Sequence, residues 1–318
     1  MNNNNLLTWL LGGLGALVFF VLCFVAIDYV GRPDSPKEEE IEEVVIATEQ
    51  TNHELIALAR SQGWIDADAA EMTSIDAAAV KELGTALQGC HLTHFDEFRY
   101  FVGVQELLPE AFAGSESLQS ITIPRSVISI NYGVLADCPS LTEIRVDTAN
   151  THYDSREDCN GIVCTWKGKL MLVAGCSTTR VIDNIRFIAP QAFRGCTAMT
   201  EISLPEKMDE IGEEAFSGCT SLTDFSVPQG VRFVEERTFQ GCTALQTISL
   251  SKSVERLRKD AFKDCPALQR IVCLKKYPPI IEDAFDTHTA TVVVPKGMLN
   301  TYYTSKYWKD FGKVVEEK

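Results

Sequence analysis

A phenylalanine that returns every 23 residues constrains the fold of this chain more than any other feature of its sequence. The spacing holds without a slip from residue 193 to residue 285. A repeat of this length is typical of a solenoid, in which every coil buries one face against its neighbours and cannot be stable alone. The repeated residues are Phe193, Phe216, Phe239, Phe262 and Phe285.

Other apolar columns keep the same step. A cysteine follows the phenylalanine by three residues in four coils, and an Ile, Val or Leu precedes it by five. Two earlier coils are visible at Phe112, with Ser115 in the cysteine column, and at Leu135, with Cys138. From Cys138 to Cys196 the gap is one period plus 35 residues, so one coil carries an insertion. The sequence therefore predicts about seven coils of 23 residues.

Each coil is predicted to hold a strand and a short helical turn. The run from Leu222 to Val227 ends in alternating apolar residues, as a half-buried strand does. Pro228 then ends the strand, because proline cannot donate a hydrogen bond to a ladder. Residues 212–219 are small and bounded by glycines, which favours a single helical or 3₁₀ turn. The expected fold class is an α/β solenoid over residues 92–295.

The two ends of the solenoid are predicted to be capped. Residues 51–91 look helical, because Thr51 with Glu54 and Thr73 with Asp76 both fit capping boxes. Such a helical pair would cover the exposed first coil. At the other end, residues 292–295 predict the last strand, and residues 296–318 a C-terminal cap. That cap is expected to be a helix from Met298 to Phe311, anchored by Tyr302, Trp308 and Phe311.

An uncharged apolar segment stands near the start of the chain. As a helix, residues 6–27 would span roughly 33 Å at about 1.5 Å per residue, enough to cross a bilayer. We therefore expect a transmembrane anchor over residues 6–30, between a tail (1–5) and an acidic linker (31–50). A cleaved signal peptide is the alternative, but such peptides start with basic residues, and this chain starts with Met and four Asn.

The orientation of this anchor stays open. Arg32 and Lys37, the only basic residues near it, both follow the apolar segment. The positive-inside tendency would then keep the repeats in the cytoplasm, although two residues are a weak signal.

Charge and motifs exclude several function classes. The net charge of −15 comes mainly from residues 1–100, which hold 16 acidic and 5 basic residues, against 28 and 24 in residues 101–318. Without a basic stripe, nucleic acid is not expected as a partner. The chain has no Gly-x-Ser-x-Gly elbow, phosphate-binding loop or His-Glu-x-x-His motif, so the sequence predicts neither an enzyme nor a cofactor.

The coil from Ile211 to Pro228, Ile-Gly-Glu-Glu-Ala-Phe-Ser-Gly-Cys-Thr-Ser-Leu-Thr-Asp-Phe-Ser-Val-Pro, resembles the BspA-like (type 5) branch of leucine-rich repeat proteins. The passage from Tyr153 to Cys176 resembles a hairpin insertion common in that family, and the ending from Pro278 to Phe311 resembles its usual close. The resemblance covers residues 92–318. It implies an exported or surface-bound bacterial protein that serves adhesion or protein binding, without naming a ligand.

One segment before the repeats departs from the family. Residues 64–80 resemble a stretch that often has the spacing of a calcium loop. Here the ligand positions are held by Ile65, Ala67 and Ala69, and the turn glycine is replaced by Ala70. We therefore expect no calcium at this segment.

The cysteines divide into two groups. Cys138 and the later members of its column should stack about 5 Å apart with parallel side chains, which favours buried free thiols over disulfides. For Cys159 and Cys176 in the insertion, a disulfide is the alternative if the hairpin is extracellular. No metal site is expected, because the cluster Cys90-His91-x-x-His94 lacks a second ligand pair.

Outward strand positions form two polar columns that could contact a partner. Their acidic centre would suit a cationic or hydroxyl-rich ligand, whereas the bland alternative is that their Ser and Thr residues simply pair across strands. The inserted hairpin, residues 147–181, is an equally good candidate. The candidate contact residues are Glu143, Arg145, Glu201, Asp224 and Arg270 in the columns, and Tyr153 and Trp166 in the hairpin.

Two hypotheses for the function result. The first is a membrane-tethered binding module whose repeats lie outside the cytoplasm, at the cell surface or in the periplasm, and contact a protein or glycan. The second is a structural or regulatory membrane scaffold whose repeats lie in the cytoplasm.

Overall fold

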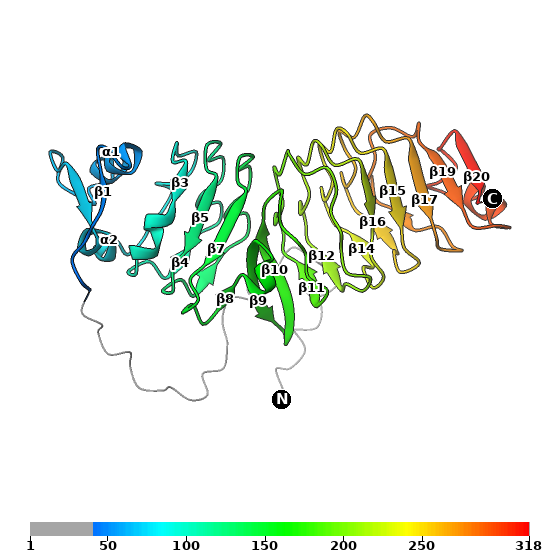
Figure 1. The fold of residues 1–318 in the computed structure, drawn as a ribbon. Helices are drawn as coiled ribbons and strands as arrows, with labels where there is room; N and C mark the ends of the chain where they lie inside the picture. The colour runs from blue at the N-terminus through cyan, green and yellow to red at the C-terminus, as the bar shows by residue number, and fades with distance from the viewer. Residues whose placement is uncertain (1–40, 318) are drawn as a thin grey trace, which may run out of the picture. The chain divides into compact units, whose positions relative to one another are not determined.

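The computed structural model describes residues 41–317 (Figure 1). Residues 42–317 belong to one compact unit. The predicted tail, the transmembrane anchor and most of the acidic linker lie outside the described residues. Within residues 41–317, every helix falls short of the length and hydropathy that a membrane crossing requires.

Two ladders of short parallel strands run along the solenoid, as Figure 1 shows from β3 to β20. The partners lie in register, because each residue pairs with the equivalent residue of the next coil. The first ladder contains β3 (His94–Phe95), β5 (Ser120–Ile123) and β7 (Glu143–Val146), and then β13 (Asp224–Ser226), β15 (Thr247–Leu250), β17 (Arg270–Cys273), β19 (Thr291–Val294) and β20 (Lys313–Glu316). The second contains β4 (Glu106–Leu107), β6 (Ser129–Ile130), β11 (Ile185–Ile188), β12 (Glu210–Ile211), β14 (Phe233–Val234), β16 (Arg256–Leu257) and β18 (Ile280–Ile281).

The predicted solenoid is confirmed, but it is longer than expected. The described residues make about ten turns, whereas the 23-residue spacing predicts about seven. The additional turns have other lengths: ladder partners His94 and Ser120 lie 26 residues apart, and Thr291 and Lys313 lie 22 apart. A search for one fixed period cannot find such turns.

The third side of each coil is a turn, and the predicted helical turn at residues 212–219 is wrong. The residue two positions before each phenylalanine has a left-handed backbone, for example Glu214 (φ 55°) and Arg237 (φ 53°). That conformation breaks a right-handed helix. The amides bond along the stack, because Phe216 N donates to Thr238 O at 2.9 Å. Two short 3₁₀ helices occur in the described residues. One, η1 (Asp96–Tyr100), lies near the first turn, and the other, η2 (Arg156–Asp158), lies in the insertion.

The phenylalanine column forms a buried stack. Successive rings from Phe193 to Phe285 lie 4.9 to 5.7 Å apart and within 9° of parallel. Beside it, four thiols of the cysteine column donate to the phenylalanine carbonyl of the preceding coil, whereas Cys196, which follows the insertion, donates to Gly175 O. The distance is 3.2 Å from Cys242 Sγ to Phe216 O. As predicted, these cysteines are free and buried.

The insertion forms three strands, β8 (Tyr153–Asp154), β9 (Gly161–Trp166) and β10 (Lys169–Gly175), that extend the sheet of β11 and β12. The predicted β-hairpin is thus present as β9 and β10, which pair antiparallel. Its side chains divide the hydrophobic core in two. Ile162 and Val173 pack into the N-terminal cluster, whereas Val163 and Leu172 pack into the C-terminal cluster. The hairpin is therefore a wall inside the core.

The N-terminal cap is mixed α/β, which corrects the predicted pair of helices. β1 (Val45–Thr48) and β2 (Glu71–Thr73) pair antiparallel, with α1 (His53–Ser61) between them and α2 (Ser74–Ala79) after them. β1 lies in the segment that was predicted to be a linker. Its apolar run buries Ala47 in the core, so this part of the segment belongs to the cap. The capping box of Thr73 and Asp76 is confirmed, but α1 is capped by Asn52 and not by Thr51.

The C-terminal cap is also shorter in helix than predicted. α3 spans Leu299–Tyr303, and the chain then returns to the first ladder as β20, so residues 292–295 are not the last strand. The three predicted anchors, Tyr302, Trp308 and Phe311, are buried. Trp308 Nε1 donates to Pro279 O at 2.7 Å, which ties the cap to the loop of an earlier coil.

Candidate binding surfaces

The polar columns of the first ladder are only partly continuous. Asp224, Thr247 and Arg270 stand on consecutive strands in register, as predicted. Glu143 lies in the separate sheet of β7, and Glu201 lies in no strand. The predicted acidic centre of Glu143, Glu201 and Asp224 is therefore interrupted, because the hairpin and the irregular turn after it separate the two sheets of the ladder.

Glu143 is also less available than its charge suggests. It forms an ion pair with Arg145, the second candidate on β7, and both side chains remain exposed. These two residues neutralise each other at the surface, so they contribute little net charge to the column.

Tyr153, a predicted contact residue, is buried. Its hydroxyl accepts a hydrogen bond from Ile130 N at 2.8 Å, which links β8 to β6 of the second ladder. Burial also raises the pKa of Tyr153 to about 12. Tyr153 therefore holds the insertion in place and is not available to contact a partner.

Cys159 and Cys176 are free, so the structure does not contain the disulfide considered for them. The reason is their placement on either side of the wall: Cys159 packs in the C-terminal cluster and Cys176 in the N-terminal cluster. Burial raises the pKa of Cys159, which disfavours the reactive thiolate.

Trp166, the other hairpin candidate, is half-buried and belongs to a surface that the sequence did not predict. Its ring meets Phe187 of β11 edge to face, with centroids 4.8 Å apart. The Lys167 ammonium lies 3.9 Å from the Trp166 ring centroid. Farther along the second ladder, Arg258 lies over the ring of Phe233, 5.1 Å from its centroid. We call Trp166, Phe187, Phe233, Arg256 and Arg258 the cation–aromatic surface.

Ladder register gives three of these residues equivalent outward positions. Met171 pairs with Phe187 and Phe187 with Glu210 in the sheet that contains the hairpin, whereas Phe233 pairs with Arg256 in the next sheet of the second ladder. Positions 187, 210, 233 and 256 lie 23 residues apart, so their side chains occupy the same outward position in successive coils. Each precedes or follows a buried column residue, such as Ile188 or Val234. A signal was present in the sequence: Phe187 and Phe233 are aromatic residues at an outward position, two periods apart.

An acidic group borders this surface. Glu235 forms an ion pair with Arg258, with Oε2 and Nε 2.9 Å apart, and lies near Glu210 and Glu213. Burial raises the pKa of Glu235 to about 7, with the neighbouring carboxylates adding to the effect and Arg258 opposing it. Charge at this edge therefore changes near neutral pH.

The part of the chain described by the structure holds no cluster of His, Cys, Asp and Glu side chains that could bind a metal ion. In residues 64–80, the segment that resembles a calcium loop, the Asp76 carboxylate caps α2 by accepting a hydrogen bond from Thr73 N at 2.8 Å. The absence of a metal or cofactor stays a prediction.

The profile of the BspA type leucine rich repeat region matches residues 85–157 and 174–291, in six copies. The match covers more than half of the chain, and the chain therefore belongs to the BspA-type leucine-rich repeat family. The gap between the two matched ranges coincides with the hairpin. No curated protein sequence is significantly similar to the chain.

One solved structure with this fold is the pneumococcal vaccine antigen PcpA. It is 15% identical with a TM-score of 0.52, over 68% of this chain and 66% of PcpA. A leucine rich cell surface protein from Faecalibacterium prausnitzii is 17% identical with a TM-score of 0.49, over 73% of this chain and 65% of that protein. The chain thus spans slightly less than two thirds of the length of either structure.

Proposed function

We propose that this protein is a non-enzymatic, membrane-tethered binding module that presents its repeats outside the cytoplasm for protein binding or adhesion. Leucine-rich repeat proteins are generally binding modules, which supports the class. The observation that carries the proposal is the cation–aromatic surface. Trp and Arg are enriched among residues that dominate protein–protein binding energy, and here they lie with two phenylalanines at outward positions along the hairpin and the second ladder.

The position of this surface supports a role in recognition. Phe187, Phe233 and Arg256 stand on strands of the second ladder that pair with neighbouring strands, and Trp166 ends β9, which pairs with β10. Side chains held on such a rigid sheet lose little conformational entropy on binding, which favours affinity. The half-buried rings provide apolar area, and the arginines provide charged hydrogen-bond donors beside it.

Site-specific photo-crosslinking on intact cells tests this proposal. A benzophenone amino acid at position 187 should capture a defined partner protein, and Phe233→Ala in the same chain should lower the yield at least tenfold. The matched control places the probe at position 247, an outward position of the first ladder, where no partner should be captured. Equal capture at both positions, or capture unaffected by Phe233→Ala, would contradict the proposed surface.

The second candidate function is a membrane scaffold with cytoplasmic repeats. Arg32 and Lys37, which follow the apolar segment, favour it through the positive-inside tendency. The two functions differ in the side of the membrane on which the repeats lie.

A further inference from the structure

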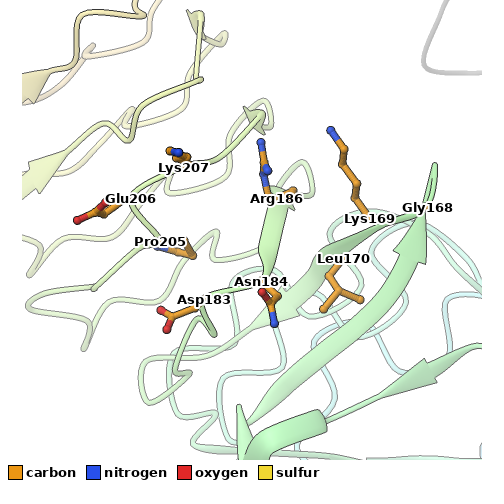
Figure 2. Close-up of a pocket in the computed structure, with 9 residues that line it drawn as sticks. All are labelled: Gly168, Lys169, Leu170, Asp183, Asn184, Arg186, Pro205, Glu206 and Lys207. Atoms are coloured by element: carbon orange, nitrogen blue, oxygen red, sulfur yellow. The ribbon is translucent and has the colours of Figure 1, made fainter.

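A polar hollow lies beside the tip of the hairpin (Figure 2). Three segments far apart in the sequence line it: the hairpin tip at residues 168–170, the stretch from Asp183 to Arg186 at the start of β11, and the turn at residues 205–207. Its volume of about 790 Å³ is in the range of small-molecule sites, which is about 300–1,000 Å³. The hollow exists only because the insertion breaks the repeat at this point.

Two basic side chains of the hollow, Lys169 and Arg186, are held in place by one carboxylate. Asp209 accepts a hydrogen bond from Lys169 Nζ at 2.7 Å and is also bonded to the guanidinium of Arg186. Figure 2 shows both basic side chains extending to the same side of the hollow. One carboxylate therefore orients two donor groups that come from different strands, β10 and β11.

The remaining polar side chains of the hollow have no partner within residues 41–317. Asp183, Asn184, Glu206 and Lys207 are exposed, and their side chains form neither hydrogen bonds nor ion pairs with the described residues. Leu170 adds a half-buried apolar surface. The hollow thus offers free acceptors and free donors around a small apolar patch.

The charges of the hollow balance. Lys169, Arg186 and Lys207 are cationic, whereas Asp183 and Glu206, together with Asp209 behind them, are anionic. A phosphate or carboxylate ligand would meet two free carboxylates, and a cationic peptide would meet three basic groups. A neutral polyol meets neither penalty, since each hydroxyl both donates and accepts hydrogen bonds.

We propose that this hollow binds a neutral saccharide. Its hydroxyl groups would bond to the free side chains of Asp183, Asn184, Glu206 and Lys207, and the fixed Lys169 and Arg186 would donate from the other side. A carbon–hydrogen face of the sugar would cover Leu170. The site borders the cation–aromatic surface, since Lys169 Nζ lies 5.9 Å from the Phe187 ring centroid, but it does not rest on the protein contact proposed for that surface.

A glycan array probed with the full-length protein, followed by calorimetric titration of the best ligand, tests the site. The array should contain neutral gluco-, galacto- and manno-oligosaccharides beside sialylated and sulfated ones. We expect a neutral oligosaccharide to bind, and Asp183→Ala with Glu206→Ala to weaken it at least tenfold. Both side chains are exposed and unbonded, so this double variant should fold normally. Asp224→Ala, another exposed acidic substitution, should leave the affinity unchanged.

Three results would overturn the saccharide site: no neutral oligosaccharide binding at millimolar concentration, binding restricted to acidic glycans, or equal affinity in the double variant. Each of them leaves the crosslinking result at position 187 untouched. Failure of this site is therefore distinguishable from failure of the proposed function.

Discussion

At the scale of single residues, the cysteine column is explained by a hydrogen bond. Cys219, Cys242 and Cys265 each donate to a phenylalanine carbonyl of the preceding coil at 3.1 to 3.2 Å. In an earlier coil Ser115 takes the same role, because its hydroxyl donates to Leu87 O at 3.0 Å. The column therefore requires a small side chain with a donor. Burial raises the pKa of Cys265 to about 12, so these thiols are inert.

Substitution at Cys242 separates this role from simple packing. Cys242→Ala leaves a buried carbonyl with one partner fewer and removes the sulfur, so we expect a loss of about 2 kcal/mol in the free energy of unfolding. Cys242→Ser keeps a donor and should lose about half as much. Urea denaturation of the two variants measures the difference. If Ser proved more destabilising than Ala, the hydrogen bond would not explain the column.

At the scale of elements, the role of the hairpin in the structure differs from the one expected from the sequence. As an insertion between two repeats, it was expected to contact a partner. In the structure it joins the two halves of the solenoid, because alternate side chains of β9 and β10 enter different hydrophobic clusters. A strand that buries both faces in this way cannot be removed without exposing both clusters.

Leu172→Ala tests the wall. Leu172 is fully buried on β10, so the substitution should cost roughly 2–5 kcal/mol and separate unfolding into two transitions, one for each half. Lys169→Ala, on the same strand but exposed, should change the stability by less than about 0.5 kcal/mol. Calorimetry and urea denaturation provide the readout. A loss at Leu172 as small as that at Lys169 would show that the hairpin is only a surface excursion.

At the scale of the whole molecule, the solenoid is a stack that both caps close. The first turn is covered by the mixed cap of residues 42–91, and β20 with Trp308 closes the last. A stack of this kind is stabilised by contacts between neighbouring coils, so its length can vary while its cross-section stays the same. The recognition surfaces depend instead on where the stack is interrupted.

Orientation in the membrane is decided at the same scale. If residues 6–27 anchor the protein with its repeats outside the cytoplasm, a protease added to intact cells should digest the repeats. Buried coils resist cleavage, so exposed positions such as Tyr277 in the loop after β17 should be cut first. A cytoplasmic control protein must stay intact. Protection of the repeats until lysis would favour the scaffold with cytoplasmic repeats.

The repeat, the buried columns and the three closing aromatic residues were predictable because stacked coils require the same apolar residue at the same position. Phe239 and Trp308 could be placed in the core without any structure. The turn before Phe216 was mispredicted as helical, because the left-handed backbone of Glu214 has no sequence signal such as a glycine. The extra turns were missed because their lengths depart from 23 residues.

The candidate sites were less predictable than the fold. Trp166 was predicted as a contact residue, but its partner Phe187 was not, because it stands beside a buried column. Tyr153 was misplaced, because nothing in the sequence shows that its hydroxyl reaches Ile130 N. The polar hollow combines residues 168–170, 183–186 and 205–207, a grouping that depends on how the chain re-enters the solenoid after the hairpin.

By itself, the sequence determined that this protein is a solenoid, which residues form its core, and that its periodic positions serve stability. The physical reason is that stacking repeats the same contacts, so they appear as a period. Only the tertiary structure decided that the hairpin divides the core and which side chains converge into the cation–aromatic surface and the polar hollow. Those contacts join residues from unequal turns, and no period in the sequence records them.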